Sequence, residues 1–468
     1  MHTTSPPSLH VEPNRRGRRA ARRPARARRA RLFRHELRTL LAVAGPIIIS
    51  QLGTIGMTTV DTLMVGPLGA TALAAAAVGA AIHTTVLMVC TGVVLGMTPL
   101  VSQAFGAGDR AACRRVLVQG LWLALALSIP LAVISLAGGP LARLLDQDPA
   151  VAKLAGGYTI ALALGAPPAL LFMAVRQFLE GMGLSRPPMA TTLGGLGLNA
   201  LFNGALIYGI DGWIPAMGVV GSGWATTLVR WAMLLGILGY LAWNPELHPF
   251  RGVHWRPRAE LLRRIARIGA PAGAQMGLEV GIFALAAVMM GWLGPVELAA
   301  HEVTLNIGAT TFMVALGASM AGSIRVGHHI GARNRHGVRR AITGTYLLTL
   351  GFMGCCALLF VAAPDALVGL YTDDRAIIHL GASLLLIAAL FQLFDGGQVA
   401  GINLLRGAAD TRTPMLLAAL GYWGVGLPVA YGLGFHTPLG PRGIWTGLAL
   451  ALGVVAVLMG RRVRRVLW

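Results

Sequence analysis

Twelve long apolar segments follow one another along the chain, separated by short polar loops. Each has roughly the 20 residues that a helix needs to cross the hydrocarbon core of a bilayer. They cover residues 40–64, 72–100, 116–138, 154–176, 188–210, 219–243, 266–291, 298–324, 342–363, 379–403, 414–434 and 443–460. With 55% hydrophobic and 12% charged residues, the composition excludes an ordinary soluble domain. The sequence therefore predicts an all-α polytopic membrane protein with 12 transmembrane helices.

Basic residues alternate between the loops and so predict the orientation of the chain. One set of alternate loops, together with the C-terminal tail, carries 22 arginines, whereas the opposite set carries four basic residues. Cytoplasmic loops are the ones enriched in Lys and Arg. We therefore expect both termini in the cytoplasm and the protein in the cytoplasmic (inner) membrane. The net charge of +21 reflects this bias, so we expect no nucleic-acid partner.

The two ends of the chain are strongly basic. Residues 1–38 contain twelve arginines and few large apolar side chains, so we expect a disordered basic cytoplasmic arm drawn to anionic lipid headgroups. Residues 461–468 form a basic cytoplasmic tail.

The two halves of the chain repeat one another. A shift of 225 residues aligns 45–115 with 270–340 without a gap, and a shift of 226 then aligns Gly181 with Gly407. Each half holds six spans, and an even number makes the repeat parallel, about an axis along the membrane normal. We expect an N-terminal six-helix lobe (39–243), a cytoplasmic linker (244–265) and a C-terminal six-helix lobe (266–460), with a substrate cleft between the lobes.

Acidic residues inside the apolar spans are the candidate functional groups, because an unpaired carboxylate in hydrocarbon costs several kcal/mol and usually marks an ion or substrate path. Glu279 lies 12 residues past Arg267, and Asp395 lies 11 residues before Arg406. At the helical rise both acids are about 16 to 18 Å from the cytoplasmic boundary. The alternative is a pair of structural acids, but neither helix offers a basic partner near its acid.

The first lobe offers a different polar set. Asp61 and Asn203 are expected at comparable depth, and Asn199 lies one helical turn from Asn203 on the same face. Together they predict a polar patch. The alternatives are that Asp61 reaches the outer interface or caps its helix, and that the asparagines only join helices. The repeat matches Glu279 with Thr54, so the acids of the two lobes are not duplicates.

A carboxyl group away from water is suited either to taking up a proton or to coordinating sodium together with carbonyl oxygens. Either event changes the local charge by one. A cation gradient would then drive release of a cationic substrate from the same cavity. We expect Na+ or H+ as the coupling ion and no other cofactor. If the ion is Na+, we expect it at Glu279 and Asp395.

Several motifs resemble one transporter family. They are VDTLMVGPLGA (60–70), GLEVGIFA (277–284), ELAAHEVTLN (297–306), SIRVGHHIGA (323–332), FDGGQV (394–399) and LLRGAADTRTPM (404–415). In this order they resemble the multidrug and toxic compound extrusion transporters, NorM-like branch.

The resemblance implies that Glu279 and Asp395 bind the coupling cation and that Asp61, Asn199 and Asn203 form the first-lobe site. Relatives often have Gln at Glu302 and Tyr at Phe391. We add Phe391, Asn306 and Glu302 as candidate residues of the substrate cavity. Glu302 also fits a first-turn acid of its helix.

The favoured function is therefore export of amphipathic organic cations in exchange for Na+ or H+, by a monomer surrounded by membrane lipids. A lipid-linked saccharide flippase is the rival transporter, but such cavities tend to be strongly basic and only Arg230 lies well inside a span. A membrane enzyme is disfavoured because the spans hold no HExxH, GxSxG or acid-rich metal motif, so we expect no catalytic residues. His328, His329 and His336 are expected to be solvated in a cytoplasmic loop.

Overall fold

The computed structural model describes residues 15–244, 247, 252 and 254–468. The first part of the predicted arm (1–14) and seven residues of the predicted linker (245–246, 248–251 and 253) lie outside the described residues. The first half contains α1 (Arg15–Val65), η1 (Gly66–Leu68), α2 (Ala70–Val94), α3 (Met97–Gly106), α4 (Arg110–Leu136), α5 (Gly138–Leu144), α6 (Pro149–Ala163), α7 (Ala166–Gly181), α8 (Arg186–Ile207) and α9 (Val219–Trp243). The second half contains α10 (Ala259–Leu293), α11 (Pro295–Gly331), α12 (Arg335–Ala362), α13 (Pro364–Gly369), α14 (Arg375–Gly407), α15 (Arg412–Ala419), the π-helical turn η2 (Leu420–Gly426), α16 (Leu427–Phe435) and α17 (Pro441–Leu467).

The number of membrane spans agrees with the sequence prediction. Within the described ranges, 11 helical segments are long and apolar enough to cross a bilayer. The pair α6 and α7, bent by 47° at its break, supplies a twelfth. The chain is therefore an all-α, multi-pass membrane protein with a 12-helix fold.

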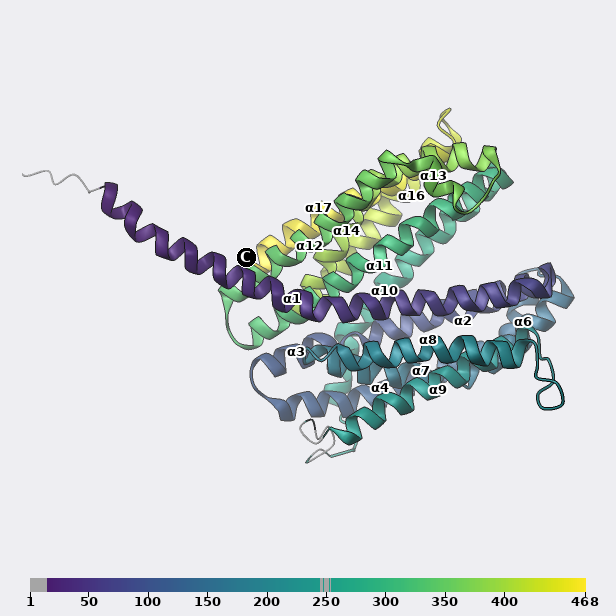
Figure 1. The fold of residues 1–468 in the computed structure, drawn as a ribbon, viewed down its shortest axis with the longest axis horizontal. Coiled ribbons are helices and arrows are strands. Elements are labelled where there is room, and N and C mark those ends of the chain that lie inside the picture. The colour runs from purple at the N-terminus through teal and green to yellow at the C-terminus, as the bar shows by residue number, and fades with distance from the viewer. Residues whose placement is uncertain (1–14, 245–246, 248–251, 253) are drawn as a thin grey trace, which may run out of the picture.

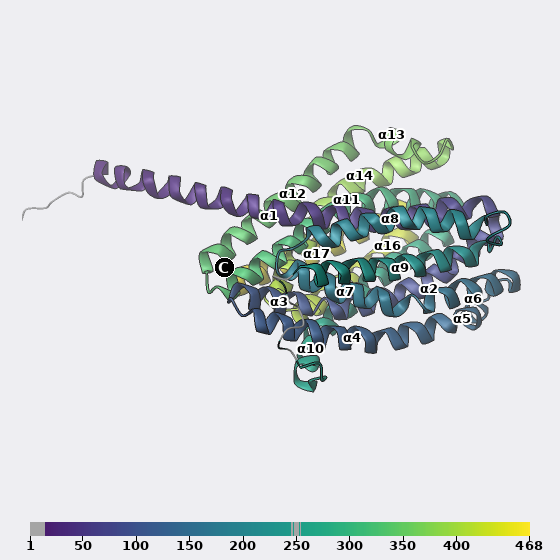
Figure 2. The ribbon, with the colours of Figure 1, turned by 60° about the horizontal axis from the view of Figure 1, so that its bottom comes forward.

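Helix α1 begins earlier than expected. It starts at Arg15, so the prediction of a disordered arm is wrong for residues 15–38. Arginine and alanine are good helix formers, and a helix extends from an existing one without a new nucleation step. The segment therefore continues the first span beyond the rest of the bundle, as Figures 1 and 2 show.

The sequence repeat recurs in the helix caps. Asp109 caps α4 by accepting a hydrogen bond from Ala112 N at 2.8 Å, and its counterpart Asn334 caps α12 by accepting one from Gly337 N at 2.9 Å. Two further repeat-related aspartates cap α6 and α14 in the same way. An N-cap side chain satisfies a backbone N–H that the helix itself leaves unpaired. The two halves therefore begin these helices with the same local chemistry.

The bundle consists of two lobes, α1–α9 and α10–α17. Figure 1 shows their ribbons close together at one end and diverging toward the other. The first helix of each half crosses to the other lobe, since α1 packs against α11 and α10 packs against α2. Each lobe has its own apolar core, with Phe178 buried in the first and Trp445 in the second. The lobes are thus separately packed bodies joined along two equivalent seams.

At the end where the lobes meet, a pair of repeat-related hydrogen bonds joins them. We call this the basic end, because the arginine-rich α3–α4 and α11–α12 turns lie there. Gln103 on α3 donates through Nε2 to the carbonyl oxygen of Gly407 at 2.9 Å. Its counterpart His328 on α11 donates through Nε2 to the carbonyl oxygen of Gly181, the counterpart of Gly407, at 2.8 Å. Each lobe therefore holds the other by the same contact.

Small residues allow this close approach. A Cβ on Gly106 would overlap the His328 carbonyl group, and a Cβ on its counterpart Gly331 would overlap the Gln103 carbonyl oxygen. The His328 ring also packs on Phe105, with ring centroids 5.1 Å apart. The expectation that His328 is solvated in a loop is therefore wrong, because α11 continues to Gly331 and carries the ring into the seam between the lobes.

An ion pair between α1 and α11 also joins the lobes at the basic end. Glu36 on α1 binds Arg325 on α11 through two hydrogen bonds of 2.8 Å, and its Oε2 lies 2.9 Å from His329 Nε2. Bidentate carboxylate–guanidinium contacts fix geometry as well as adding energy. The expectation that His329 is solvated is likewise wrong.

Candidate functional site

A cavity of about 300 Å³ lies between the lobes. Helices α1, α2 and α7 line it from the N-terminal lobe, and α10, α11 and α14 line it from the C-terminal lobe. Five methionines and two phenylalanines form much of its wall, and methionine adapts readily to differently shaped apolar ligands. The polar lining residues are Gln51, Thr91, Arg176, Gln177, Gln275, Glu279, Gln398, Asn403 and Arg406.

Two carboxylates come together on the C-terminal side. Glu279 on α10 lines the cavity, and Asp395 on α14 lies beside it, with 6% of its surface exposed. Gln275 donates through Nε2 to Glu279 Oε2 at 3.1 Å. Gln398 donates through Nε2 to Asp395 Oδ1 at 3.0 Å. Each acid is thus held by a glutamine one turn away on its own helix.

A π-helical turn brings a tyrosine to the same place. Tyr422, in η2, is buried and donates its hydroxyl to Gln398 Oε1 at 2.5 Å. This contact fixes which end of the Gln398 amide faces Asp395. The π-helical geometry is rare and is often found at functional sites. The corresponding helix of the first lobe, α8, is a regular α-helix.

Helix α14 also carries an arginine into the cavity. Arg406 is 6% exposed, and its guanidinium interacts electrostatically with Glu279. Its Nη1 donates to Asn403 Oδ1 at 2.8 Å, whereas its buried Nε has no hydrogen-bond partner. The expectation that Glu279 and Asp395 lack a basic neighbour is therefore wrong. The sequence places Arg406 at the end of a span, but α14 continues to Gly407 and buries it.

The predicted polar patch of the first lobe is present. Asp61 Oδ1 accepts hydrogen bonds from Asn199 Nδ2 at 2.9 Å and from Asn203 Nδ2 at 2.6 Å. Asp61 and Asn199 line a second cavity, of about 250 Å³, inside the N-terminal lobe. Asp61 therefore points into the lobe and does not cap its helix or reach outward.

A chain of polar contacts links this patch to a histidine. Arg230 interacts electrostatically with Asp61, and its Nη1 lies 2.9 Å from His83 Nε2. Ser135 donates its hydroxyl to a backbone carbonyl at 2.7 Å, so His83 Nδ1–H donates to Ser135 Oγ, at 2.8 Å. Arg230 is therefore the donor to His83 Nε2, and the imidazole is neutral. Asp61 and Arg230 balance one another in charge.

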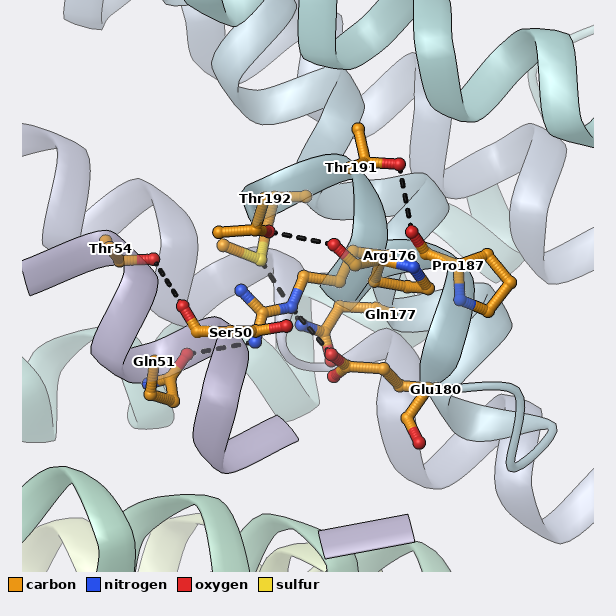
Figure 3. A network of polar contacts seen from close by, with 12 residues as sticks. Ser50, Gln51, Thr54, Arg176, Gln177, Glu180, Pro187, Thr191 and Thr192 are labelled. Carbon is orange, nitrogen blue, oxygen red and sulfur yellow. Dashed lines mark hydrogen bonds and ion pairs between the residues drawn. The ribbon is translucent and has the colours of Figure 1, made fainter. Parts of the chain in front are cut away.

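A buried ion pair faces the inter-lobe cavity from the N-terminal lobe (Figure 3). Arg176 Nε lies 2.7 Å from Glu180 Oε1, one turn along α7, and both side chains are almost fully buried. Arg176 Nη2 also donates to Gln51 Oε1 on α1 at 2.9 Å. Thr54, the counterpart of Glu279, donates only to the carbonyl oxygen of Ser50, at 3.0 Å. Among the described residues, the first lobe thus contributes no carboxylate to the wall of this cavity.

The three other predicted cavity residues do not line the cavity between the lobes. Phe391 is 5% exposed and packs between Phe283 and Trp445, with ring centroids 6.2 and 5.6 Å away. Asn306 is exposed and accepts a hydrogen bond from a tyrosine hydroxyl at 3.1 Å. Glu302 is exposed and is not a first-turn acid, since α11 begins at Pro295. Helical spacing does not determine which face of a helix meets the cavity.

Sequence reasoning missed four residues of the C-terminal site. Gln275 and Gln398 lie four residues before Glu279 and three residues after Asp395, so a search of the same helix face would have found them. Arg406 required knowledge of where α14 ends. Tyr422 reaches the site through an irregular turn, which no spacing rule indicates.

The donor set limits the chemistry of the C-terminal site. It consists of carboxylate and amide oxygens, which suit a proton or a hard cation. Within the described part of the chain, no group of three or more His, Cys, Asp or Glu side chains could hold a metal ion.

Comparison with known proteins gives a consistent result. The family model MatE matches residues 46–204 and 271–432, one match in each half. The "Probable multidrug resistance protein NorM" of Pseudomonas putida is 40% identical over 433 residues, covering 91% of this chain and 93% of that protein. The "Multidrug resistance protein PmpM" of Pseudomonas aeruginosa is 37% identical and covers 92% of each chain. Among solved structures, the eukaryotic MATE transporter AtDTX14 superposes with a TM-score of 0.84 at 21% identity, over 92% of this chain and 96% of that chain.

Proposed function

Because this chain belongs to the multidrug and toxic compound extrusion family, NorM-like branch, we propose that it exports amphipathic organic cations from the cell in exchange for inward-moving Na+ or H+. It is a multidrug efflux transporter and not an enzyme. It lies in the cytoplasmic membrane as a monomer with both termini, and therefore the basic end, in the cytoplasm. The 22-to-4 bias of basic residues between alternate loops supports this orientation.

The observation that carries the proposal is the pair Glu279 and Asp395 at the wall of the cavity between the lobes. Buried carboxylates at a cavity wall attract a cation, and a coupling ion and an organic cation then compete for the same charge. The methionines and phenylalanines of the wall accept apolar parts of many shapes, and aromatic faces attract organic cations. Binding of the coupling ion therefore releases the substrate.

Alternating access follows from the packing of the two lobes. They are joined at the basic end by Gln103–Gly407 and His328–Gly181, and they diverge toward the opposite end (Figure 1). Rocking of the lobes about the cavity would break these contacts and expose the cavity to the cytoplasm. The structure thus corresponds to an outward-facing state in this proposal.

The rival function, a saccharide flippase, is less well supported. The sequence suggested that only Arg230 lies well inside a span, but Arg176 and Arg406 line the cavity between the lobes. Arg176 is paired with Glu180, however, and Arg406 lies beside Glu279. Recognition of an anionic lipid phosphate would require a basic cavity, and this cavity is not basic.

Transport by purified protein tests the proposal. Proteoliposomes that hold the protein and a fluorescent organic cation would be given a Na+ gradient at fixed pH, or a proton gradient without Na+. We expect one of the two gradients to drive movement of the cation, and Glu279→Gln to abolish it. Gradient-driven transport that survives both Glu279→Gln and Asp395→Asn would disprove the site assignment.

A further inference from the structure

Arg406 is a permanent positive charge placed inside the proposed cation site. A guanidinium stays protonated in proteins, so burial does not remove its charge. Its Nε has no hydrogen-bond partner among the described residues, and its Nη1 donates to Asn403. The Arg406 guanidinium faces the cavity and interacts electrostatically with Glu279. A cation in this position competes with any cation that enters.

The repeat shows that the scaffold does not require this arginine. Position 406 corresponds to Glu180 in the first half, which has the opposite charge. Arg176, which pairs with Glu180, corresponds in turn to Ile402. The same turn of the two equivalent helices therefore carries a closed ion pair in one lobe and a single arginine in the other. Arg406 belongs to the site of the C-terminal lobe and not to the shared framework.

The charges of the described residues around the two cavities nearly cancel. In the N-terminal lobe Arg176 offsets Glu180, and Arg230 offsets Asp61. In the C-terminal lobe Arg406 interacts with Glu279, and Glu279 with Asp395. When both carboxyl groups are ionised, these three groups carry a single net negative charge. A buried net charge is costly unless a counter-ion neutralises it. With both carboxyl groups ionised, the C-terminal site therefore calls for one further positive charge.

We propose that Arg406 sets the charge capacity of the C-terminal site, so that the site holds one unit of positive charge at a time. That unit is either one coupling ion or one monovalent organic cation. The inference rests on the proposed function and adds the substrate class to it: a site with this charge capacity selects monocations over dications. Without Arg406, Glu279 and Asp395 together would accept two units.

The test compares a mono-quaternary ammonium dye with its bis-quaternary analogue. Their binding to detergent-solubilised protein and their gradient-driven transport would both be measured. In the wild type we expect the monocation to be preferred. In Arg406→Gln we expect the ratio of monocation to dication binding to fall by about tenfold. Loss of the guanidinium adds one net negative charge to the site, and this favours the dication. Arg406→Met, which keeps the apolar stem, provides a second neutral variant in case Arg406→Gln does not fold.

Two controls preserve the charge of the site. Arg406→Lys should keep the wild-type ratio. Arg462→Gln removes an arginine of the same lobe that pairs with Asp410 at 2.9 Å, outside the cavity, and should also keep the ratio. A ratio that stays at the wild-type value in a folded neutral variant of Arg406 would overturn the inference.

A double variant tests whether the net charge of the site, and not the Glu279 side chain itself, controls monocation binding. Glu279→Gln alone leaves one carboxylate and one guanidinium in the site, which then has no net charge, so monocation binding should be lost. Adding Arg406→Gln restores one net negative charge, and monocation binding should recover to within about tenfold of the wild type. Absence of recovery in a folded double variant would contradict the inference. Failure of the wild type to move either dye under both gradients would instead disprove the proposed function.

Discussion

The N-terminal and C-terminal lobes are alike in framework and unlike in charge. They share helix caps, a lobe-to-lobe hydrogen bond and a glycine at the crossing of α3 and α11. Yet the acid Glu279 is matched by Thr54, Asp395 by Ala169 and Arg406 by Glu180. The duplicated features are helix caps and contacts between the lobes. The charges that a cation would meet in the cavity are not duplicated.

This contrast makes two kinds of prediction. Substitutions at duplicated positions should have equal effects in both lobes, whereas substitutions of charged groups should not. The following experiments are ordered from the largest expected effect to the smallest.

Removal of an acid from the C-terminal site should have the largest effect. Glu279→Gln and Asp395→Asn each leave the site without net negative charge, and we expect cation transport to fall by about 100-fold or more. Transport in proteoliposomes and binding of the dye to purified protein would both be measured. Thr54→Val, the matched change in the first lobe, should keep at least half of the activity. A comparable loss in Thr54→Val would remove the distinction between the lobes.

Much of this contrast was visible in the sequence. Apolar segment lengths predicted the 12 spans, and the ungapped shift predicted the repeat, because both depend on local composition and periodicity. The acids Glu279, Asp395 and Asp61 stood out because charge is rare in a span. The polar patch of Asp61, Asn199 and Asn203 followed from their comparable depth and from helix spacing.

The rest depended on where helices end and which way they face. Arg406 and His328 looked like loop residues, because only packing shows that α14 and α11 continue past them. Phe391 lies on the buried face of α14, which spacing alone did not reveal. Tyr422 depends on a π-helical turn that has no sequence signature.

Closure at the basic end should be the next most sensitive feature, and equally so in both lobes. Gly106→Ala and Gly331→Ala each introduce a Cβ that overlaps the backbone of the opposite lobe. We expect each to reduce transport by about tenfold, since closing the lobes then requires a backbone shift. Distances between spin labels on α3 and α11 would show the lobes further apart at this end.

Gly194→Ala is the control for this pair, because Gly194 lies in a helix and has open space around it. It should leave both the distances and transport unchanged. If Gly106→Ala altered transport and Gly331→Ala did not, the two seams would not be equivalent.

The acid of the first lobe should matter less than those of the second. Asp61 is already balanced by Arg230 and held by two asparagines, so it does not present an unmet charge to the inter-lobe cavity. We expect Asp61→Asn to lower transport by about tenfold, mainly through loss of these hydrogen bonds. Dye binding at the C-terminal site should stay within about threefold of the wild type. Loss of binding as complete as in Glu279→Gln would mean that the two sites act as one.

The smallest effect is expected at Glu302, an acid in α11 that looks functional in the sequence. Its side chain is exposed and does not line the cavity between the lobes, whereas Glu279 does. Because Glu302 does not contact the cavity in which we propose that the cation binds, Glu302→Gln should change transport by less than about twofold. The same proteoliposome assay, with Glu279→Gln measured beside it, gives the comparison directly. A loss of more than about tenfold in Glu302→Gln would show that cations meet this residue on their path, and that the outer part of α11 belongs to the site.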